Sequence, residues 1–164
     1  MDMKQDQYSK IVSYITENQK MFYRLAYSYA QNREDALDVV QNAVCKALEH
    51  YQELRNEEAV RTWFYRILVN ESLQLIKERS RLVPEEEGMG ELSYEERKFE
   101  PQDDLYDCIN RLDGETQTII KLRFYEELPL KEIARIMGMN LNTVKAKLYR
   151  GLRQLKIEIR EVDL

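Results

Sequence analysis

The chain has 164 residues with 43% hydrophobic and 34% charged side chains, a net charge of −5, five glycines and three prolines. This length allows one domain or two small ones, and so few glycines and prolines are typical of a helical protein rather than one rich in β-turns. The sequence contains no apolar run of the roughly 18 residues that a membrane-spanning helix needs. Its polar first residues are unlike a signal peptide, so we expect a cytoplasmic protein.

Two helices are predicted within the first 51 residues. The first extends from Tyr8 to Tyr29, with an apolar stripe that is less regular near residues 16–20. Asn32 is the predicted N-cap of the second helix, which carries acidic residues in its first turn and ends near Tyr51. The face of this helix opposite its apolar stripe includes Asp35, Asp38 and Gln41. This face is either a solvated surface or an acidic docking surface, and the spacing alone favours the solvated surface.

A third long helix is predicted from Arg61 to Arg81, after a polar loop at residues 52–58. It carries the only tryptophan, Trp63, and five basic residues against two acidic ones. Aromatic rings that stack on bases, with cations that follow phosphates, form single-strand binding surfaces. Aromatic side chains are more often core residues, however, so this helix alone leaves the two interpretations evenly balanced.

The stretch from Leu82 to Asp104 differs in composition from its surroundings. It holds nine acidic residues, two basic residues, two glycines and two prolines, which predicts a flexible acidic linker. We therefore expect an all-α protein made of two small helical bundles: a domain at residues 1–82, a linker at 83–104 and a second domain at 105–164. Neither bundle alone buries a large core.

The second domain begins with two short predicted helices. Leu105 to Leu112 forms the first, Asp113 and Gly114 form a turn, and Glu115 to Tyr125 forms the next, with these residues facing inward: Thr116, Ile119, Ile120 and Phe124.

A helix-turn-helix is predicted from Leu130 to Lys156. Apolar residues recur at helical spacing on both sides of Gly138, which is placed where the first helix must end and the chain must turn. Asn140 is the predicted N-cap of the second helix. Residues 141–160 contain six basic residues and one acidic residue. An isolated basic helix is more often a solvated surface, but the preceding helix and glycine turn favour phosphate as the partner here.

Catalytic and metal-binding patterns are absent from the sequence. Cys45 and Cys108 are far apart, lack metal-ligand spacing and are expected to be core thiols in a reducing compartment, and His50 is the only histidine. No paired carboxylates, nucleophile–base set or phosphate-binding glycine loop is present, so we expect neither an enzyme nor a cofactor.

The order of these features resembles the extracytoplasmic-function (ECF, group 4) sigma factors of the sigma-70 family, the promoter-recognition subunits of bacterial RNA polymerase. Residues 34–44 resemble region 2.2, residues 61–70 resemble regions 2.3 and 2.4, and residues 128–134 with 142–153 resemble region 4.2. Residues 21–29 are similar to the sigma-V-like, envelope-stress members. The resemblance spans nearly the whole chain.

The resemblance implies a role for each part. Region 2.2 of the family docks on the clamp helices of the largest polymerase subunit, and the matching positions are Asp35, Asp38 and Gln41. Regions 2.3 and 2.4 melt the −10 element, and the matching residues are Arg61, Thr62, Trp63, Arg66 and Asn70. Region 4.2 reads the −35 element and lies at the polymerase flap; the candidates for DNA contact are Asn142, Thr143, Lys145, Lys147, Arg150 and Arg153. A cognate anti-sigma factor, commonly membrane-anchored, is the further partner that the family implies.

The sequence departs from the family pattern at three places, and three alternative functions stay open. Asn142, Ala146 and the pair at residues 60–61 differ from the residues common in the family, so promoter specificity does not transfer. The alternatives are a stand-alone helix-turn-helix regulator, an enzyme, and an anti-sigma or adaptor protein without DNA contact. The first leaves the tryptophan helix and the acidic linker without a role.

Overall fold

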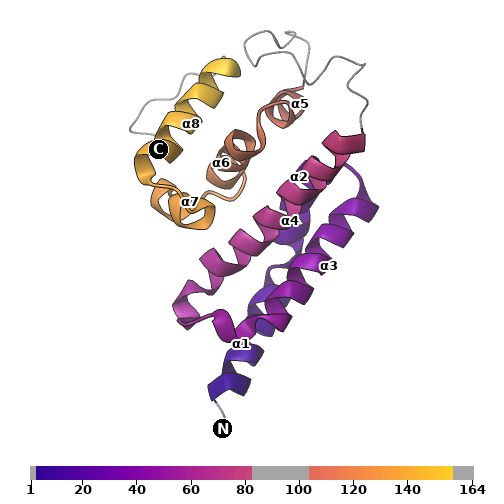
Figure 1. Ribbon diagram of the computed structural model, residues 1–164, viewed down its shortest axis with the longest axis vertical. Helices are drawn as coiled ribbons and strands as arrows, with labels where there is room; N and C mark the ends of the chain where they lie inside the picture. The colour runs from indigo at the N-terminus through magenta and orange to yellow at the C-terminus, as the bar shows by residue number, and fades with distance from the viewer. Residues whose placement is uncertain (1–2, 83–103, 157–164) are drawn as a thin grey trace. The chain divides into compact units, whose positions relative to one another are not determined.

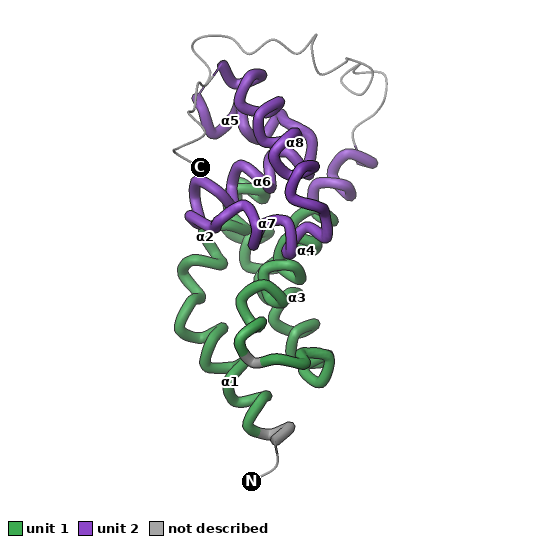
Figure 2. The backbone as a smooth tube through the Cα atoms, turned by 90° about the vertical axis from the view of Figure 1, so that its left-hand side faces the viewer, with its two compact units in different colours: residues 1–75 green, residues 76–164 purple. Residues whose placement is uncertain are grey.

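The computed structural model describes residues 3–82 and 104–156, and every regular element in these two stretches is a helix (Figure 1). In chain order the elements are α1 (Met3–Glu17), α2 (Gln19–Ala30), α3 (Arg33–Glu49), the short 3-10 helices η1 (Tyr51–Glu53) and η2 (Glu57–Ala59), α4 (Val60–Leu82), α5 (Leu105–Asn110), α6 (Gly114–Phe124), α7 (Leu130–Met137) and α8 (Leu141–Gln154). The chain divides into two compact units, residues 1–75 and residues 76–164, and the boundary between them lies within α4 (Figure 2). The prediction of an all-α protein with two helical groups is confirmed. The flexible linker predicted at 83–104 lies outside the described residues, apart from Asp104.

Aromatic side chains from α2 and α4 form the centre of the first unit. The ring of Phe22 lies 4.6 Å from that of Phe64 and 5.7 Å from that of Tyr65, measured between centroids. All three side chains are buried, and such tilted and edge-on pairs add about 0.5–1.5 kcal/mol each beyond the burial of their area. Helix α3 packs against both α1 and α2. Two of the three consecutive aromatic residues at 63–65 are therefore core residues.

The predicted helix from Tyr8 to Tyr29 is wrong in one respect, because the chain breaks at Asn18 into α1 and α2. The backbone of Asn18 leaves the helical region (φ −117°, ψ 17°), and its side-chain amide donates to the carbonyl of Tyr14 over 2.7 Å. Asparagine competes for backbone hydrogen bonds in this way and weakens a helix interior. The irregular apolar pattern at residues 16–20 marked this break.

The predicted start of α3 is confirmed, whereas the predicted burial of the cysteines is confirmed for only one of the two. Asn32 caps α3 by accepting a hydrogen bond from the backbone N–H of Asp35 over 2.9 Å. Cys108 is buried as expected, whereas Cys45 is exposed. The expectation for Cys45 was wrong because this position of α3 faces an open groove and not the core.

Helix α6 is the central element of the second unit and packs against α5, α7 and α8. Every residue from Thr116 to Leu122 is buried, which includes four polar side chains. Asp113 caps the helix through the backbone N–H of Thr116 over 2.8 Å, so Gly114 is its first residue and not part of a free turn. Phe124, predicted to face inward, is 38% exposed because it is the last residue of α6, beyond the section that the other helices cover.

Candidate nucleic-acid interface

The turn between α7 and α8 is set by its local sequence. Gly138 ends α7 with a left-handed backbone (φ 65°), and its N–H donates to the carbonyl of Ala134. This conformation favours glycine over residues with a side chain. Two residues later, Asn140 accepts a hydrogen bond from the backbone N–H of Thr143 over 2.8 Å and so begins α8. The helix-turn-helix and both of its predicted capping residues are confirmed.

The inner face of α8 seats the helix on its neighbours. Val144, Leu148 and Leu152 are at most 4% exposed, and α8 packs against both α6 and α7. Gly151 lies at the closest approach to α6, since a Cβ atom there would lie 2.6 Å from Cγ2 of Thr116. The orientation of α8 in the second unit is therefore fixed by packing along its whole length.

The outer face of α8 carries the six residues predicted to contact DNA. Asn142, Lys145, Arg150 and Arg153 are exposed, and Thr143 and Lys147 are half-buried. No acidic residue occurs in α8, so this face presents positive charge to the solvent. A helix with this charge, anchored by its inner face, is suited to lie against the phosphates of a DNA groove.

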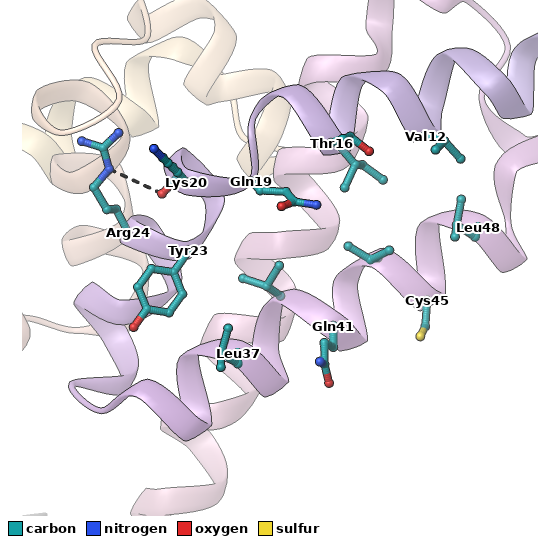
Figure 3. Close-up of a pocket in the computed structure, with 13 residues that line it drawn as sticks. Val12, Thr16, Gln19, Lys20, Tyr23, Arg24, Leu37, Gln41, Cys45 and Leu48 are labelled. Carbon is teal, nitrogen blue, oxygen red and sulfur yellow. Dashed lines mark hydrogen bonds between the residues drawn. The ribbon is translucent and has the colours of Figure 1, made fainter.

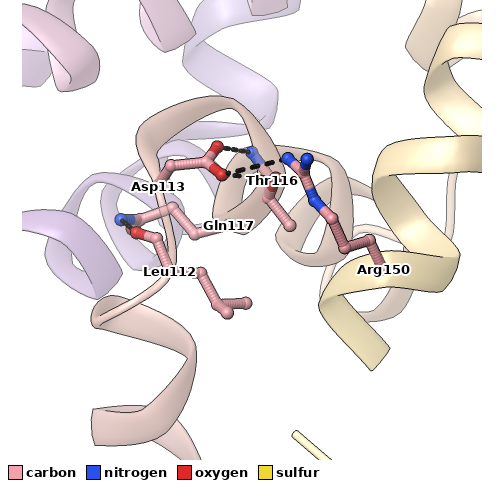
Figure 4. Close-up of polar contacts among 5 residues, drawn as sticks. All are labelled: Leu112, Asp113, Thr116, Gln117 and Arg150. Carbon is pink, nitrogen blue, oxygen red and sulfur yellow. Dashed lines mark hydrogen bonds and ion pairs between the residues drawn. The ribbon is translucent and has the colours of Figure 1, made fainter. Parts of the chain in front are cut away.

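One of these cations has a partner at the N-terminus of α6, in the capping residue Asp113. Nη2 of Arg150 lies 3.5 Å from Oδ2 of Asp113, and the two side chains are 53% and 41% exposed. The same Oδ2 accepts a hydrogen bond from the hydroxyl of Thr116 over 2.9 Å (Figure 4). Arg150 is thus oriented by the residue that caps the neighbouring helix, which the sequence analysis did not anticipate.

Helix α4 presents a second set of candidate residues in the first unit. Phe64, Tyr65 and Leu68 are buried, whereas Arg61, Arg66 and Asn70 are exposed, and Thr62 and Trp63 are half-buried. Positions 63, 66 and 70 follow helical spacing, so an indole ring, a guanidinium and an amide share one side of the helix. An aromatic ring beside hydrogen-bonding groups is what an unstacked base requires.

Helix α3 carries the predicted docking residues on its outer side. Asp38 and Gln41 are exposed, and Asp35 is half-buried. The carboxylate of Asp35 accepts a hydrogen bond from the side-chain amide of Asn32 over 3.1 Å. Asp35 therefore also belongs to the N-terminal cap of α3, whereas Asp38 and Gln41 face outward.

Gln41 also lines a groove that α1, α2 and α3 enclose (Figure 3). The groove has a volume of about 830 Å³, and its apolar lining includes Val12, Leu37, Val40 and Val44. Val12 and Leu37 are each 38% exposed. This groove was not predicted from the sequence, although the apolar arc of α3 is wider than a single packing partner would cover.

A buried lysine is the main electrostatic anomaly of the second unit. Lys121 on α6 is 0% exposed, and its Nζ donates to Oε1 of Gln117 over 2.8 Å. Burial lowers the pKa of Lys121 from 10.5 to about 7. Burial, followed by the charges of Tyr106 and Asp104, raises the pKa of Tyr125 to about 12. Neither pKa shift was predicted from the sequence.

The described part of the chain has neither a metal-binding cluster nor a membrane-spanning helix. Residues 3–82 and 104–156 contain no group of three histidine, cysteine, aspartate or glutamate side chains placed to hold a metal ion. None of their helices is both long and apolar enough to cross a membrane.

Comparison with known proteins gives matches in both units. The family profile described as "Sigma-70 region 2" matches residues 14–82, and the profile described as "Sigma-70, region 4" matches residues 102–155. The chain is 39% identical to the RNA polymerase sigma factor SigV of Bacillus subtilis, over 100% of this chain and 99% of that protein. It is 27% identical to the ECF RNA polymerase sigma-E factor of Haemophilus influenzae, over 91% and 93% of the two chains.

Solved structures show the same fold at low sequence identity. The sigma factor RpoE in complex with the anti-sigma factor NepR from Bartonella quintana matches with a TM-score of 0.65 at 18% identity, covering 88% of this chain and 92% of that one. CnrH in complex with the cytosolic domain of CnrY matches with a TM-score of 0.66 at 16% identity, covering 93% and 92%.

Proposed function

The chain belongs to the sigma-70 family of RNA polymerase sigma factors, in its ECF group, and we propose that it reads the −35 element with α8 and opens the −10 element with α4. Members of this family direct RNA polymerase to start transcription and are non-catalytic, so the chain is a sigma factor and not an enzyme. The division into a region 2 domain at residues 1–82, a linker at 83–104 and a region 4 domain at 105–164 is part of the proposal.

The outer face of α8 is the observation that carries the −35 assignment. Asn142, Thr143 and Lys145 lie in the first turns of α8, where a recognition helix brings side chains to base edges in the major groove. Lys147 and Arg153 follow along the helix and are assigned mainly to phosphates, which set position and carry no sequence information. Arg150 lies between them, and we assign it to the −35 element, where a guanidinium can meet a base edge as well as a phosphate. Burial of the inner face supports this division, because it leaves the polar and basic side chains as the surface that DNA can meet.

The −10 assignment rests on the exposed side of α4. A base that leaves the duplex costs roughly a few kcal/mol in lost stacking and pairing. The half-buried ring of Trp63 and the polar groups of Arg66 and Asn70 offer stacking and hydrogen bonds that offset this cost. Arg61 and Thr62 lie at the start of the same helix, next to the segment from Tyr51 to Val60, which we propose as the pocket for the flipped base.

Docking on the polymerase is assigned to α3 and to region 4. Asp38 and Gln41 on the outer side of α3, with Asp35 at its start, are proposed to meet the clamp helices of the largest subunit, and the region 4 domain is proposed to meet the flap. The net charge of −5 supports a requirement for the polymerase. Free DNA repels the acidic chain as a whole, whereas the holoenzyme would hold both basic helices in place at one promoter.

A cognate anti-sigma factor is the second proposed partner, and an envelope-stress response is the proposed setting. Support for both comes from the ECF group and from the 39% identity to SigV over the full chain. Bacterial polymerase and its DNA lie in the cytoplasm, so we propose the cytoplasm as the place of action and a membrane-anchored anti-sigma factor as the regulator. A stand-alone helix-turn-helix regulator would account for α7 and α8 alone, whereas sigma-70 profiles match both units.

Transcription from two templates separates the roles of α4 and α8. Holoenzyme formed with Trp63→Ala should lose activity on a duplex promoter and recover it when the −10 region is already unpaired, because the template then supplies the melting. Holoenzyme formed with Lys145→Ala should be impaired on both templates. Lys10→Ala removes a lysine of α1 that pairs with Asp6 over 3.4 Å and serves as the charge-matched control. A Trp63→Ala defect that is equal on both templates would contradict the role of α4 in melting.

A further inference from the structure

A close contact brings the recognition helix to the start of α6. A Cβ atom at Gly151 would lie 2.6 Å from Cγ2 of Thr116 and 2.9 Å from Cδ1 of Ile120, and both of these residues belong to α6. A side chain at position 151 would overlap with those of Thr116 and Ile120 unless they shift, so glycine suits this close approach. This close approach places Arg150, the preceding residue of α8, at the N-terminus of α6.

At this position Arg150 pairs with the carboxylate of Asp113, which two other hydrogen bonds already hold in place. Its Oδ1 accepts from the backbone N–H of Thr116 over 2.8 Å, and its Oδ2 accepts from the hydroxyl of Thr116 over 2.9 Å. Thr116 itself is 0% exposed. Nη2 of Arg150 lies 3.5 Å from the same Oδ2 (Figure 4). The fixed carboxylate therefore orients the arginine, and the arginine does not orient the carboxylate.

Capping alone does not require an acidic residue at this position. Asparagine and serine cap a helix about as well as aspartate does, so the charge at residue 113 is available for Arg150. The guanidinium is a rigid planar fork, and holding one of its nitrogens sets the direction of the others. With the Arg150 side chain 53% exposed, those other N–H groups can meet DNA while the ion pair persists.

The ion pair between Asp113 and Arg150 has two effects on DNA binding, and both increase discrimination. An arginine that is already oriented loses less rotamer freedom when it makes a defined contact, which strengthens binding to the correct site. The neighbouring carboxylate also offsets part of its positive charge, which weakens sequence-independent attraction to phosphates. Both effects widen the gap between the −35 element and other DNA.

We propose that Asp113 is a positioning residue for promoter recognition: its carboxylate, fixed at the N-terminus of α6, orients Arg150 and increases discrimination for the −35 element. This inference rests on the proposed function of α8.

Asp113→Asn provides the direct test, because asparagine keeps the cap and removes the charge. Holoenzymes formed from the full chain are compared on two duplexes: one with the −35 sequence that wild-type holoenzyme selects from a random library, and one with that sequence replaced. The ratio of the two affinities should fall about two- to fivefold, the range expected for an exposed ion pair. Affinity for the replaced duplex should stay equal or rise. Asp113→Ser, which also caps, should behave in the same way.

A second substitution distinguishes positioning from a general structural defect. In an Arg150→Gln background, Asp113→Asn should leave the affinity ratio unchanged, because the group that it orients is gone. A wild-type ratio in Asp113→Asn, or an equal loss in both backgrounds, would overturn the inference and leave the proposed function intact. A wild-type holoenzyme with no −35 preference would overturn both.

Discussion

Lys121→Met is expected to change how the stability of the second unit depends on pH. In the folded protein Lys121 is buried and its pKa is about 7 instead of 10.5. Between these two values the unfolded chain therefore holds more protons at this position than the folded chain does. Stability consequently rises with pH across this window, and the cost of burying the charge is fully present only below pH 7.

The magnitude follows from the size of the change in pKa. A fall from 10.5 to about 7 corresponds to about 5 kcal/mol of free energy of unfolding. From pH 8 to pH 9 the wild-type chain should gain about 1.4 kcal/mol relative to the variant. Methionine is an unbranched apolar side chain that suits the space of the lysine stem. It leaves Oε1 of Gln117 without the lysine donor, but this loss does not depend on pH.

Urea denaturation at pH 7, 8 and 9, followed by circular dichroism, measures this difference. Trp63 is the only tryptophan and lies in the first unit, so its fluorescence reports on the first unit and provides an internal control. The Trp63 transition should have the same pH dependence in both proteins. Parallel pH profiles for the second unit in wild type and Lys121→Met would refute the account of a buried lysine with a low pKa.

Three other substitutions test the packing and the surfaces. Gly151→Ala should destabilise the second unit by about 1–3 kcal/mol in urea denaturation, because the new methyl group would lie 2.6 Å from Thr116 Cγ2, whose rotamer the bond to Asp113 holds. Lys145→Ala should weaken holoenzyme binding to the −35 duplex by about 1–3 kcal/mol in competition assays if it contacts a base. Asp38→Ala should slow association with core polymerase and reduce its salt dependence, measured by stopped-flow mixing.

Each of these predictions has a contradicting outcome. An alanine at 151 that raises stability would mean that helix propensity, worth about 1 kcal/mol over glycine, outweighs the contact with α6. Unchanged −35 affinity in Lys145→Ala would remove this residue from the reading surface. Association of Asp38→Ala at the wild-type rate at every salt concentration would place polymerase docking elsewhere than on the outer side of α3.

Features set by neighbouring residues in the chain could be predicted from the sequence. Gly138 ends α7 and Asn140 begins α8 because a left-handed turn favours glycine and a first turn needs a side-chain acceptor. Asn32 caps α3 for the same reason. The apolar stripe of α8 likewise placed its inner face correctly, which left the basic residues outside.

Features that depend on how helices pack together could not be predicted in the same way. From the sequence alone Lys121 would be expected to face the solvent, but α5, α7 and α8 pack against α6 and the lysine is buried. The ion pair between Asp113 and Arg150 joins residues 37 positions apart and depends on the close approach at Gly151. Cys45 followed an apolar phase of α3, but the groove between three helices exposes it. The roles assigned to Trp63 and to the outer residues of α8 stay predictions.

We expect this chain to confer promoter selection on RNA polymerase and not to act on DNA alone. Transcription in vitro from genomic fragments, with purified chain and core polymerase added separately and together, tests it most directly. We expect transcripts with discrete 5′ ends that appear only when both components are present. Transcripts no different from those of core polymerase alone, together with tight sequence-specific DNA binding by the free chain, would contradict it.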